Sequence, residues 1–270
     1  MNDAAIGVFD SGLGGLTVLA ELRRLLPAED MIYLGDTARV PYGTKSQASV
    51  TQYALQVAKK LRQQDIKMLV VACNTATALA LPAIQAALPD LPIIGVVNPG
   101  AQRAVETSAT GHIGVIATEG TVLRGAYTDA IQALRGDAVV TGKACSLFVS
   151  LVEEGWVDGP LVTEIVRTYL APLQALDPAI DTLVLGCTHY PVLQPVIAEI
   201  MGPQVTLVDS ALTTAEVVRE RLLKDGLECS ADRAGHTEFQ VTDGPERFAR
   251  VAGIFLGDAV GVQDVHLVDL

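Results

Sequence analysis

Two cysteines are the residues of this sequence best placed to do chemistry. Cys73 and Cys187 each follow an apolar run typical of a buried strand, and each precedes small polar residues and a helix-like stretch. A thiol at a helix N-terminus is expected to have a pKa below the usual value of about 8.5, which makes the thiolate available near neutral pH. Both cysteines could therefore act as an acid or a base. A buried, unreactive thiol is the alternative for either one.

The surroundings of these cysteines resemble each other. Residues 69–75 read LVVACNT and residues 183–189 read LVLGCTH, and the IGV that opens at Ile6 returns at Ile113. The pattern predicts two related α/β halves, with chance similarity between buried strands as the alternative. Two thiols presented across one cleft suit a reaction that inverts a carbon centre, because a base on one face must be matched by an acid on the other.

Two further ionisable residues lie beside these segments. Asp10 ends the first apolar run and is followed by Ser-Gly, while His189 comes two residues after Cys187. Either side chain could take the substrate ammonium proton or polarise the neighbouring thiol. Asp10 could instead cap a turn, and His189 could be an ordinary packed histidine.

Neutral polar residues complete the candidate site. The Pro41-Tyr42-Gly43 turn offers a hydroxyl and a backbone N–H that could hold a carboxylate, although an ordinary turn would have the same composition. The neutral donors and acceptors that could orient a zwitterion are Asn74, Thr75, Thr118, Thr121 and Thr188. Each of these could equally be a helix cap.

Short apolar runs alternate with amphipathic stretches, which predicts an α/β fold with parallel strands buried on both faces. The expected strands are residues 6–9, 31–34, 68–72, 93–97, 113–117, 138–141, 182–185 and 205–208. The expected helices are residues 16–26, 46–64, 76–88, 100–108, 123–134, 161–176, 192–201 and 213–225. The polar clusters follow strands, where ligands of open parallel sheets bind.

Composition excludes several classes of protein. The 270 residues are 50% apolar and carry a net charge of −12 without a Lys/Arg cluster, so nucleic acid is not an expected partner. No apolar run reaches the roughly 18 residues of a membrane span, and no leader-like stretch precedes Ile6, so we expect a cytoplasmic protein away from the membrane. The four cysteines are expected to be reduced, and their spacing predicts no metal site.

A dinucleotide-binding oxidoreductase is the main rival. Gly12 and Gly14 follow a strand, and Asp36 ends the next strand as a ribose-binding acid would. Thr17 occupies the place of the third glycine, however, and this hypothesis leaves the paired cysteines unexplained. A protein that binds an amino acid or a metal without catalysis is a further alternative.

Five motifs carry a family resemblance: IGVFDSGLGGLTV, YLGDTARVPYG, VVACNTATA, IGVIATEGT and LGCTHYP, spread from Ile6 to Pro191. With these motifs the chain resembles the aspartate/glutamate racemase family. The Asn-Thr after Cys73, the Thr-His after Cys187 and the Pro-Tyr-Gly turn resemble the glutamate-specific members rather than the aspartate-specific ones.

The resemblance implies direct interconversion of L- and D-glutamate without pyridoxal phosphate, another cofactor or a metal, supplying D-glutamate for peptidoglycan. Cys73 would be the base toward D-glutamate and Cys187 the base toward L-glutamate, assisted by Asp10 and His189. Glu153 would lie near the cleft in an undefined role. The substrate would be held by Asp10, Ser11, Tyr42, Gly43, Asn74, Thr75, Thr118, Thr188 and His189.

The resemblance also implies two pseudo-symmetric α/β domains, each a parallel-rich sheet flanked by helices, with the active site in the cleft between them. The first domain would comprise residues 1–98 and 208–270, and the second residues 99–207. Homodimers are expected.

Overall fold

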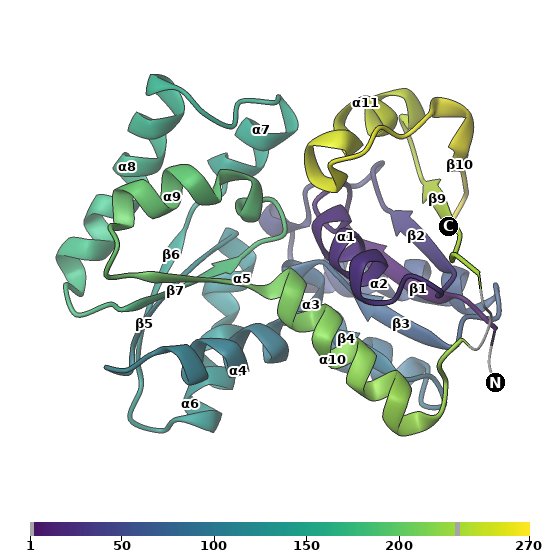
Figure 1. The fold of residues 1–270 in the computed structure, drawn as a ribbon, viewed down its shortest axis with the longest axis horizontal. Coiled ribbons are helices and arrows are strands. Elements are labelled where there is room, and N and C mark those ends of the chain that lie inside the picture. The colour runs from purple at the N-terminus through teal and green to yellow at the C-terminus, as the bar shows by residue number, and fades with distance from the viewer. Residues whose placement is uncertain (1–2, 230–232) are drawn as a thin grey trace.

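The computed structural model describes residues 3–229 and 233–270, so residues 1–2 and 230–232 of the expected first domain lie outside it. Within this part of the chain the strands form two sheets in which every neighbouring pair is parallel, and helices flank both sheets (Figure 1). The predicted fold class, α/β with two parallel sheets, is confirmed.

The first sheet has the order β10(Val265–Leu267), β9(Thr237–Val241), β2(Met31–Gly35), β1(Ile6–Asp10), β3(Met68–Val71), β4(Ile93–Gly95). The second has the order β6(Val139–Ala144), β5(His112–Ala117), β7(Thr182–Gly186), β8(Thr206–Asp209).

The α-helices are α1(Leu16–Leu25), α2(Gln47–Arg62), α3(Asn74–Ala87), α4(Val97–Thr107), α5(Glu119–Arg124), α6(Ala126–Leu134), α7(Leu147–Glu153), α8(Pro160–Leu176), α9(Gln194–Met201), α10(Ser210–Asp225) and α11(Pro245–Leu256). Short 3₁₀ helices are η1(Tyr42–Thr44), η2(Tyr190–Leu193) and η3(Val262–Asp264).

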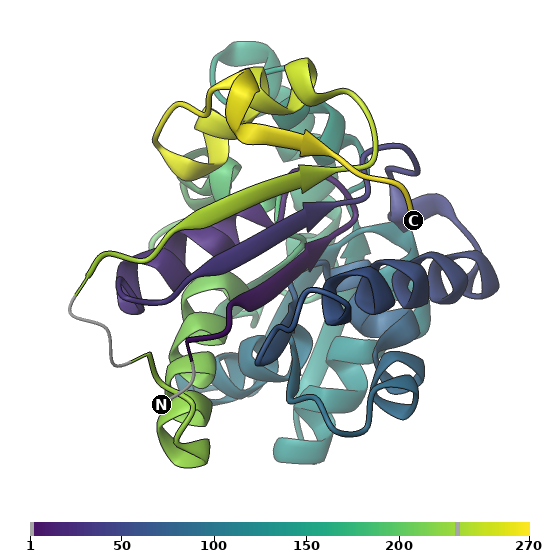
Figure 2. The same cartoon turned by 90° about the vertical axis from the view of Figure 1, so that its right-hand side faces the viewer.

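The strand order repeats between the sheets. The run β2-β1-β3-β4 of the first sheet corresponds to β6-β5-β7-β8 of the second, with β1 and β5 each between two neighbours. β3 and β7, the strands that lead to the two cysteines, therefore hold the same position in their sheets. Only the first sheet is extended, by β9, which pairs with β2, and by β10, which pairs with β9 (Figure 2).

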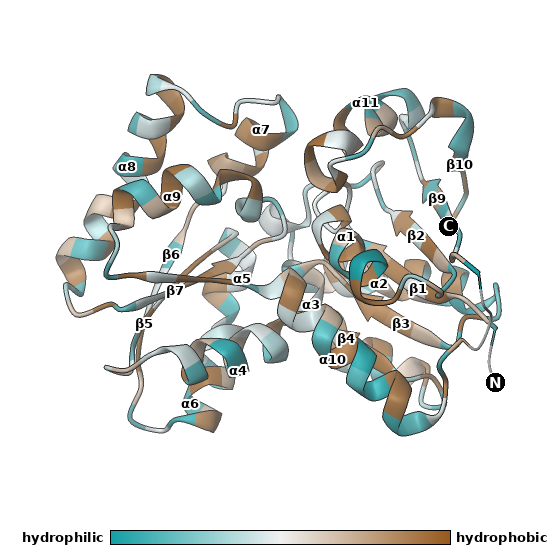
Figure 3. Cartoon of the chain, viewed as in Figure 1, coloured by the Kyte–Doolittle hydropathy of each residue, from teal (hydrophilic) through white to brown (hydrophobic). Residues whose placement is uncertain are grey.

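Burial explains why these segments form these elements. Every residue of β1, β3 and β7 is buried, as expected for apolar strands covered on both faces, and Figure 3 shows brown strands flanked by helices that alternate brown and teal. β6 is different, because it is an edge strand and none of its residues is fully buried. The expectation that residues 138–141 are buried on both faces is therefore wrong.

Other differences from the predicted elements have local causes. The single helix expected over residues 123–134 is two helices, because Gly125 between α5 and α6 has a φ of 69°, in the left-handed region. The helices α7 and α11 and the strands β9 and β10 were not predicted.

The chain passes from the first sheet to the second after β4 and returns after β8. On the return, α10 packs against both α1 and α4. The domain boundaries at residues 98–99 and 207–208 stay a prediction. No helix in the described part of the chain is long and apolar enough to cross a membrane.

Candidate active site

A small cavity lies where strands of both sheets end. It brings together residues that follow β1, β3, β5 and β7, so both halves of the chain contribute to its wall. Its lining residues are Ser11, Val40, Pro41, Tyr42, Gly43, Cys73, Asn74, Thr75, Thr118, Val149, Cys187, Thr188 and His189. Three residues named from the sequence do not line this cavity: Asp10 and Thr121, which are both buried, and Glu153. All the other predicted site residues do.

Cys73 caps the N-terminus of α3. Its sulfur accepts a hydrogen bond from the Ala76 N–H at 3.4 Å and donates one to the Ser11 hydroxyl, also at 3.4 Å. Burial, reinforced by the charge of Asp10, raises the pKa of Cys73 to about 12. The expectation of a lowered pKa is therefore wrong for Cys73, because burial outweighs the helix N-terminus. Without substrate, Cys73 is a protonated thiol at neutral pH.

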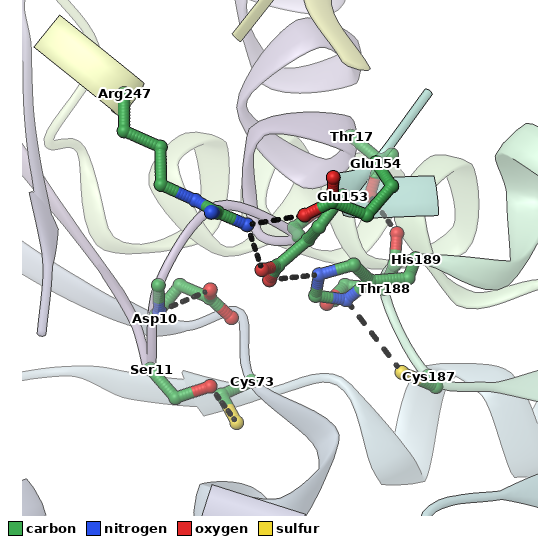
Figure 4. Close-up of polar contacts among 12 residues, drawn as sticks. Asp10, Ser11, Thr17, Cys73, Glu153, Glu154, Cys187, Thr188, His189 and Arg247 are labelled. Atoms are coloured by element: carbon green, nitrogen blue, oxygen red, sulfur yellow. Dashed lines mark hydrogen bonds and ion pairs between the residues drawn. The ribbon is translucent and has the colours of Figure 1, made fainter. Parts of the chain in front are cut away.

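Cys187 faces a charged network (Figure 4). Its sulfur lies 3.8 Å from Nδ1 of His189, and Nε2 of the same ring lies 3.1 Å from Oε1 of Glu153. The other Glu153 oxygen, Oε2, lies 3.3 Å from the Arg247 guanidinium. The helix expected after Cys187 begins with the 3₁₀ turn η2, so this cysteine does not cap an α-helix as Cys73 does.

The same network sets the protonation of His189. Burial by itself lowers the pKa of His189, but the Cys187 sulfur and the Glu153 carboxylate together raise that pKa to about 10. Burial likewise opposes ionisation of Glu153, and its contacts with His189 and Arg247 lower the Glu153 pKa overall. His189 is therefore a packed histidine that also presents a positive charge to Cys187 at neutral pH.

Asp10 begins a turn that packs against the second half of the chain. Oδ2 of Asp10 accepts a hydrogen bond from the Gly12 N–H at 2.8 Å, so Asp10 does cap its turn, while burial raises the pKa of its carboxyl group. A Cβ on Gly14 would overlap the Thr188 hydroxyl and the His189 ring. Close packing therefore explains both glycines that suggested a dinucleotide site, Gly14 against the segment after Cys187 and Gly12 against Val40.

Asp36 is fully engaged within the protein. Its carboxylate accepts hydrogen bonds from the Tyr42 hydroxyl and, at 2.9 Å, from Thr242, and it forms an ion pair with Arg39 at 2.9 Å. These contacts leave no role for Asp36 as a ribose ligand and disfavour the oxidoreductase hypothesis. They also direct the Tyr42 hydroxyl to Asp36, so the Gly43 backbone N–H is the better candidate for a carboxylate ligand in this turn.

Neutral side chains join the halves on the other side of the cavity. The hydroxyl of Thr75 lies 2.9 Å from that of Thr118, which in turn lies 3.1 Å from that of Thr121. Asn74 is bound from the second half by Tyr127, whose hydroxyl donates to Asn74 Oδ1 at 2.7 Å. The described residues contain no group of three or more His, Cys, Asp or Glu side chains that could hold a metal ion.

Sequence reasoning missed two residues and one contact of this site. The residues are Tyr127, the partner of Asn74, and Arg247, the partner of Glu153; the contact is that of Glu153 with His189. Tyr127 lies in an ordinary amphipathic helix and Arg247 in a helix that was not predicted, so no local pattern marks either residue.

Comparison with known proteins identifies the family. The family model described as Asp/Glu/Hydantoin racemase matches residues 6–218. The chain belongs to this racemase family. A glutamate racemase of Geobacter metallireducens is 51% identical over 266 residues, which cover 98% of this chain and 97% of that protein.

Solved structures of the racemase family share the whole fold. A glutamate racemase isoform of Bacillus anthracis has a TM-score of 0.94 and 40% identity, covering 100% of this chain and 99% of its own. The glutamate racemase of Francisella tularensis, solved in complex with D-glutamate, has a TM-score of 0.92 and 37% identity, covering 100% of this chain and 98% of its own.

Proposed function

We propose that this chain interconverts L- and D-glutamate by direct proton transfer between Cys73 and Cys187. The observation that carries the proposal is that two thiols, each following the equivalent strand of a repeated sheet, line the same cavity. The glutamate racemases to which the chain is similar along nearly its whole length support glutamate as the substrate.

The two thiols have opposite roles in each direction. When L-glutamate is bound, the Cys73 thiol first gives its own proton to solvent, and the thiolate then removes the α-proton while the Cys187 thiol delivers a proton to the opposite face. For D-glutamate the roles are exchanged, as microscopic reversibility requires. The positive charge of His189 stabilises a negative charge on the Cys187 sulfur by attraction. Asp10, which ends β1 in the same half as Cys73, raises the pKa of Cys73 through its negative charge.

Neutral and ionisable groups in and beside the cavity hold the zwitterion. The proposed substrate ligands are Asp10, Ser11, Tyr42, Gly43, Asn74, Thr75, Thr118, Thr188 and His189, of which all but Asp10 line the cavity. Among them, Nδ2 of Asn74 and Oδ1 of Asp10 are buried without a hydrogen-bond partner in the described part of the chain, so these two atoms are the most in need of a partner from the bound substrate.

The reaction as proposed needs no cofactor or metal, because the two thiols supply both the acid and the base. Turnover is expected to survive exhaustive treatment with a chelator. Loss of activity on chelation with recovery on adding back one metal would contradict this part of the proposal.

Further properties follow from the family resemblance and are proposed with it. D-Glutamate made in the bacterial cytoplasm would be used for peptidoglycan, and the protein would form a homodimer of two-domain subunits. Light scattering at micromolar concentration tests the oligomeric state, and growth without added D-glutamate in a strain that lacks its own racemase tests the cellular role.

Incubation with L-glutamate alone in deuterated water tests the mechanism. The circular dichroism of the amino acid should decay to zero, and the D-glutamate formed early should carry deuterium at the α-carbon while the remaining L-glutamate stays largely protiated. A single base that served both faces would instead return part of the original proton to the product. A stable dichroism signal would refute the function itself.

A further inference from the structure

One hydrogen bond connects the second half of the chain to the residue beside Cys73. The Tyr127 side chain on α6 is 2% exposed, and its hydroxyl donates to Oδ1 of Asn74 at 2.7 Å. Asn74 is also 2% exposed and is the first residue of α3, directly after Cys73. The bond therefore links a helix that covers the second sheet to the catalytic end of the first.

The two ends of the Asn74 amide are not equivalent. Oδ1 is bound by Tyr127, whereas Nδ2 is buried and has no hydrogen-bond partner among the described residues. A buried donor left unpaired costs free energy, and Asn74 lines the cavity that holds both thiols. An amide N–H₂ group in that position can donate to a substrate carboxylate, whereas the amide oxygen would repel it.

The Tyr127 ring is held in place on two sides. A Cβ on Gly186 would come within 3.0 Å of the ring, and a Cβ on Gly100 within 3.2 Å, so both glycines make room for it. Gly186 is the last residue of β7 and directly precedes Cys187. The same side chain thus packs against the strand end that carries one thiol and binds the neighbour of the other.

We propose that Tyr127 is a positioning residue for substrate binding: its hydroxyl holds the Asn74 amide with Nδ2 toward a carboxylate of the bound amino acid. The inference rests on the proposed glutamate racemase function and adds a residue to its binding site. Tyr127 acts only through Asn74 and is not itself in contact with the reacting atoms.

Tyr127→Phe tests the inference, because it removes the hydroxyl and keeps the ring that fits between Gly100 and Gly186. Loss of one hydrogen bond should raise the Kd for D-glutamate roughly three- to tenfold in this variant. Calorimetry measures this Kd. The KM should rise in parallel while kcat changes less than about twofold. Tyr169→Phe, the same chemical change on α8, is the matched control and should leave both constants unchanged.

A double-mutant cycle separates positioning from a structural effect. Asn74→Ala alone should weaken binding, and adding Tyr127→Phe to it should cause no further change in Kd. Equal weakening by Tyr127→Phe in the wild-type and Asn74→Ala backgrounds would overturn the inference. An unchanged Kd and KM for Tyr127→Phe would overturn it as well.

Measuring binding separately from turnover distinguishes this inference from the proposed function. If the wild-type protein binds D-glutamate without racemising it, the proposed function fails, and the calorimetric series still decides the role of Tyr127. If the wild-type protein binds neither enantiomer of glutamate, both proposals fail together.

Discussion

The Glu153 carboxylate lies 3.1 Å from Nε2 of His189, on the side of the ring opposite to Cys187. Glu153 belongs to α7 and is bound in turn by Arg247 of α11, so the contacts run from Cys187 to the helix between β9 and β10 (Figure 4). The charge on His189 is therefore maintained by Cys187 together with Glu153, a residue that does not line the cavity.

Replacing Glu153 should change the pH dependence of the reaction. The His189 pKa of about 10 is raised above its usual value, so the charged ring is present at neutral pH and is lost as the pH rises through that value. In Glu153→Gln the ring loses a negative neighbour, and kcat/KM should begin to fall at a lower pH than in the wild type. Superimposable profiles of kcat/KM between pH 6 and 10 would rule out this role.

Removing Arg247 should have a much smaller effect. Its side chain is 47% exposed, and exposed ion pairs contribute about 0–1 kcal/mol. Arg247→Ala should lower kcat/KM by no more than roughly fivefold, and the loss should grow smaller still in high salt. If Arg247→Ala shifted the pH dependence of kcat/KM as far as Glu153→Gln does, Arg247 as well as Glu153 would maintain the charge on His189.

Loss of either thiol should stop racemisation in both directions. Cys73→Ala and Cys187→Ala each remove the acid for one direction and the base for the other, so residual activity should be below about 0.1% from either enantiomer. Cys145→Ala is the matched control, because Cys145 is also buried but lies outside the cavity. Substantial turnover by a folded Cys73→Ala or Cys187→Ala protein would return that cysteine to the class of unreactive buried thiols.

The expected pairing of the two thiols could be derived from the sequence, and the sheet order supports it. The two halves could be predicted because each buried parallel strand is a continuous apolar run followed by a short polar turn, as in β3 and β7. The strand β9 reads TEFQV and has only three buried residues, so its pattern resembles that of many exposed segments.

The remainder of the site could not be derived because it depends on contacts between distant segments. The bonds from Tyr127 to Asn74 and from Glu153 to His189 each connect residues that no local spacing relates. The prediction of a lowered pKa for Cys73 was wrong for the same reason, because the burial that raises this pKa is set by the whole fold and not by the helix that Cys73 caps.

Adding a methyl group at Gly14, which does not line the cavity, should displace residues that do. A Cβ there would overlap Thr188 and His189, and such overpacking typically costs about 1–3 kcal/mol. Gly14→Ala should therefore lower both the melting temperature and kcat/KM. Gly136→Ala is the control, because its Cβ would meet only a backbone oxygen at 3.9 Å. Equal melting temperatures and kcat/KM values for the two variants would contradict close packing at Gly14.

Glutamate should be strongly preferred over aspartate. A side chain shorter by one methylene leaves buried donors such as the Gly43 N–H and the Thr188 hydroxyl without an acceptor, and sites of this kind reject such analogues strongly. The ratio of kcat/KM for the two amino acids should exceed about 100. Comparable values would assign the chain to a racemase of broader specificity.

The position of β9 has a consequence for how the molecule is completed during synthesis. β9 pairs with β2 and itself supports β10, yet it follows the entire second sheet in the chain. A growing polypeptide can therefore close its second sheet while the first still has β2 as an open edge, a surface that can pair with other chains. Truncation before Thr237 should leave that edge exposed. Chains released early from the ribosome should therefore aggregate as well as lack activity.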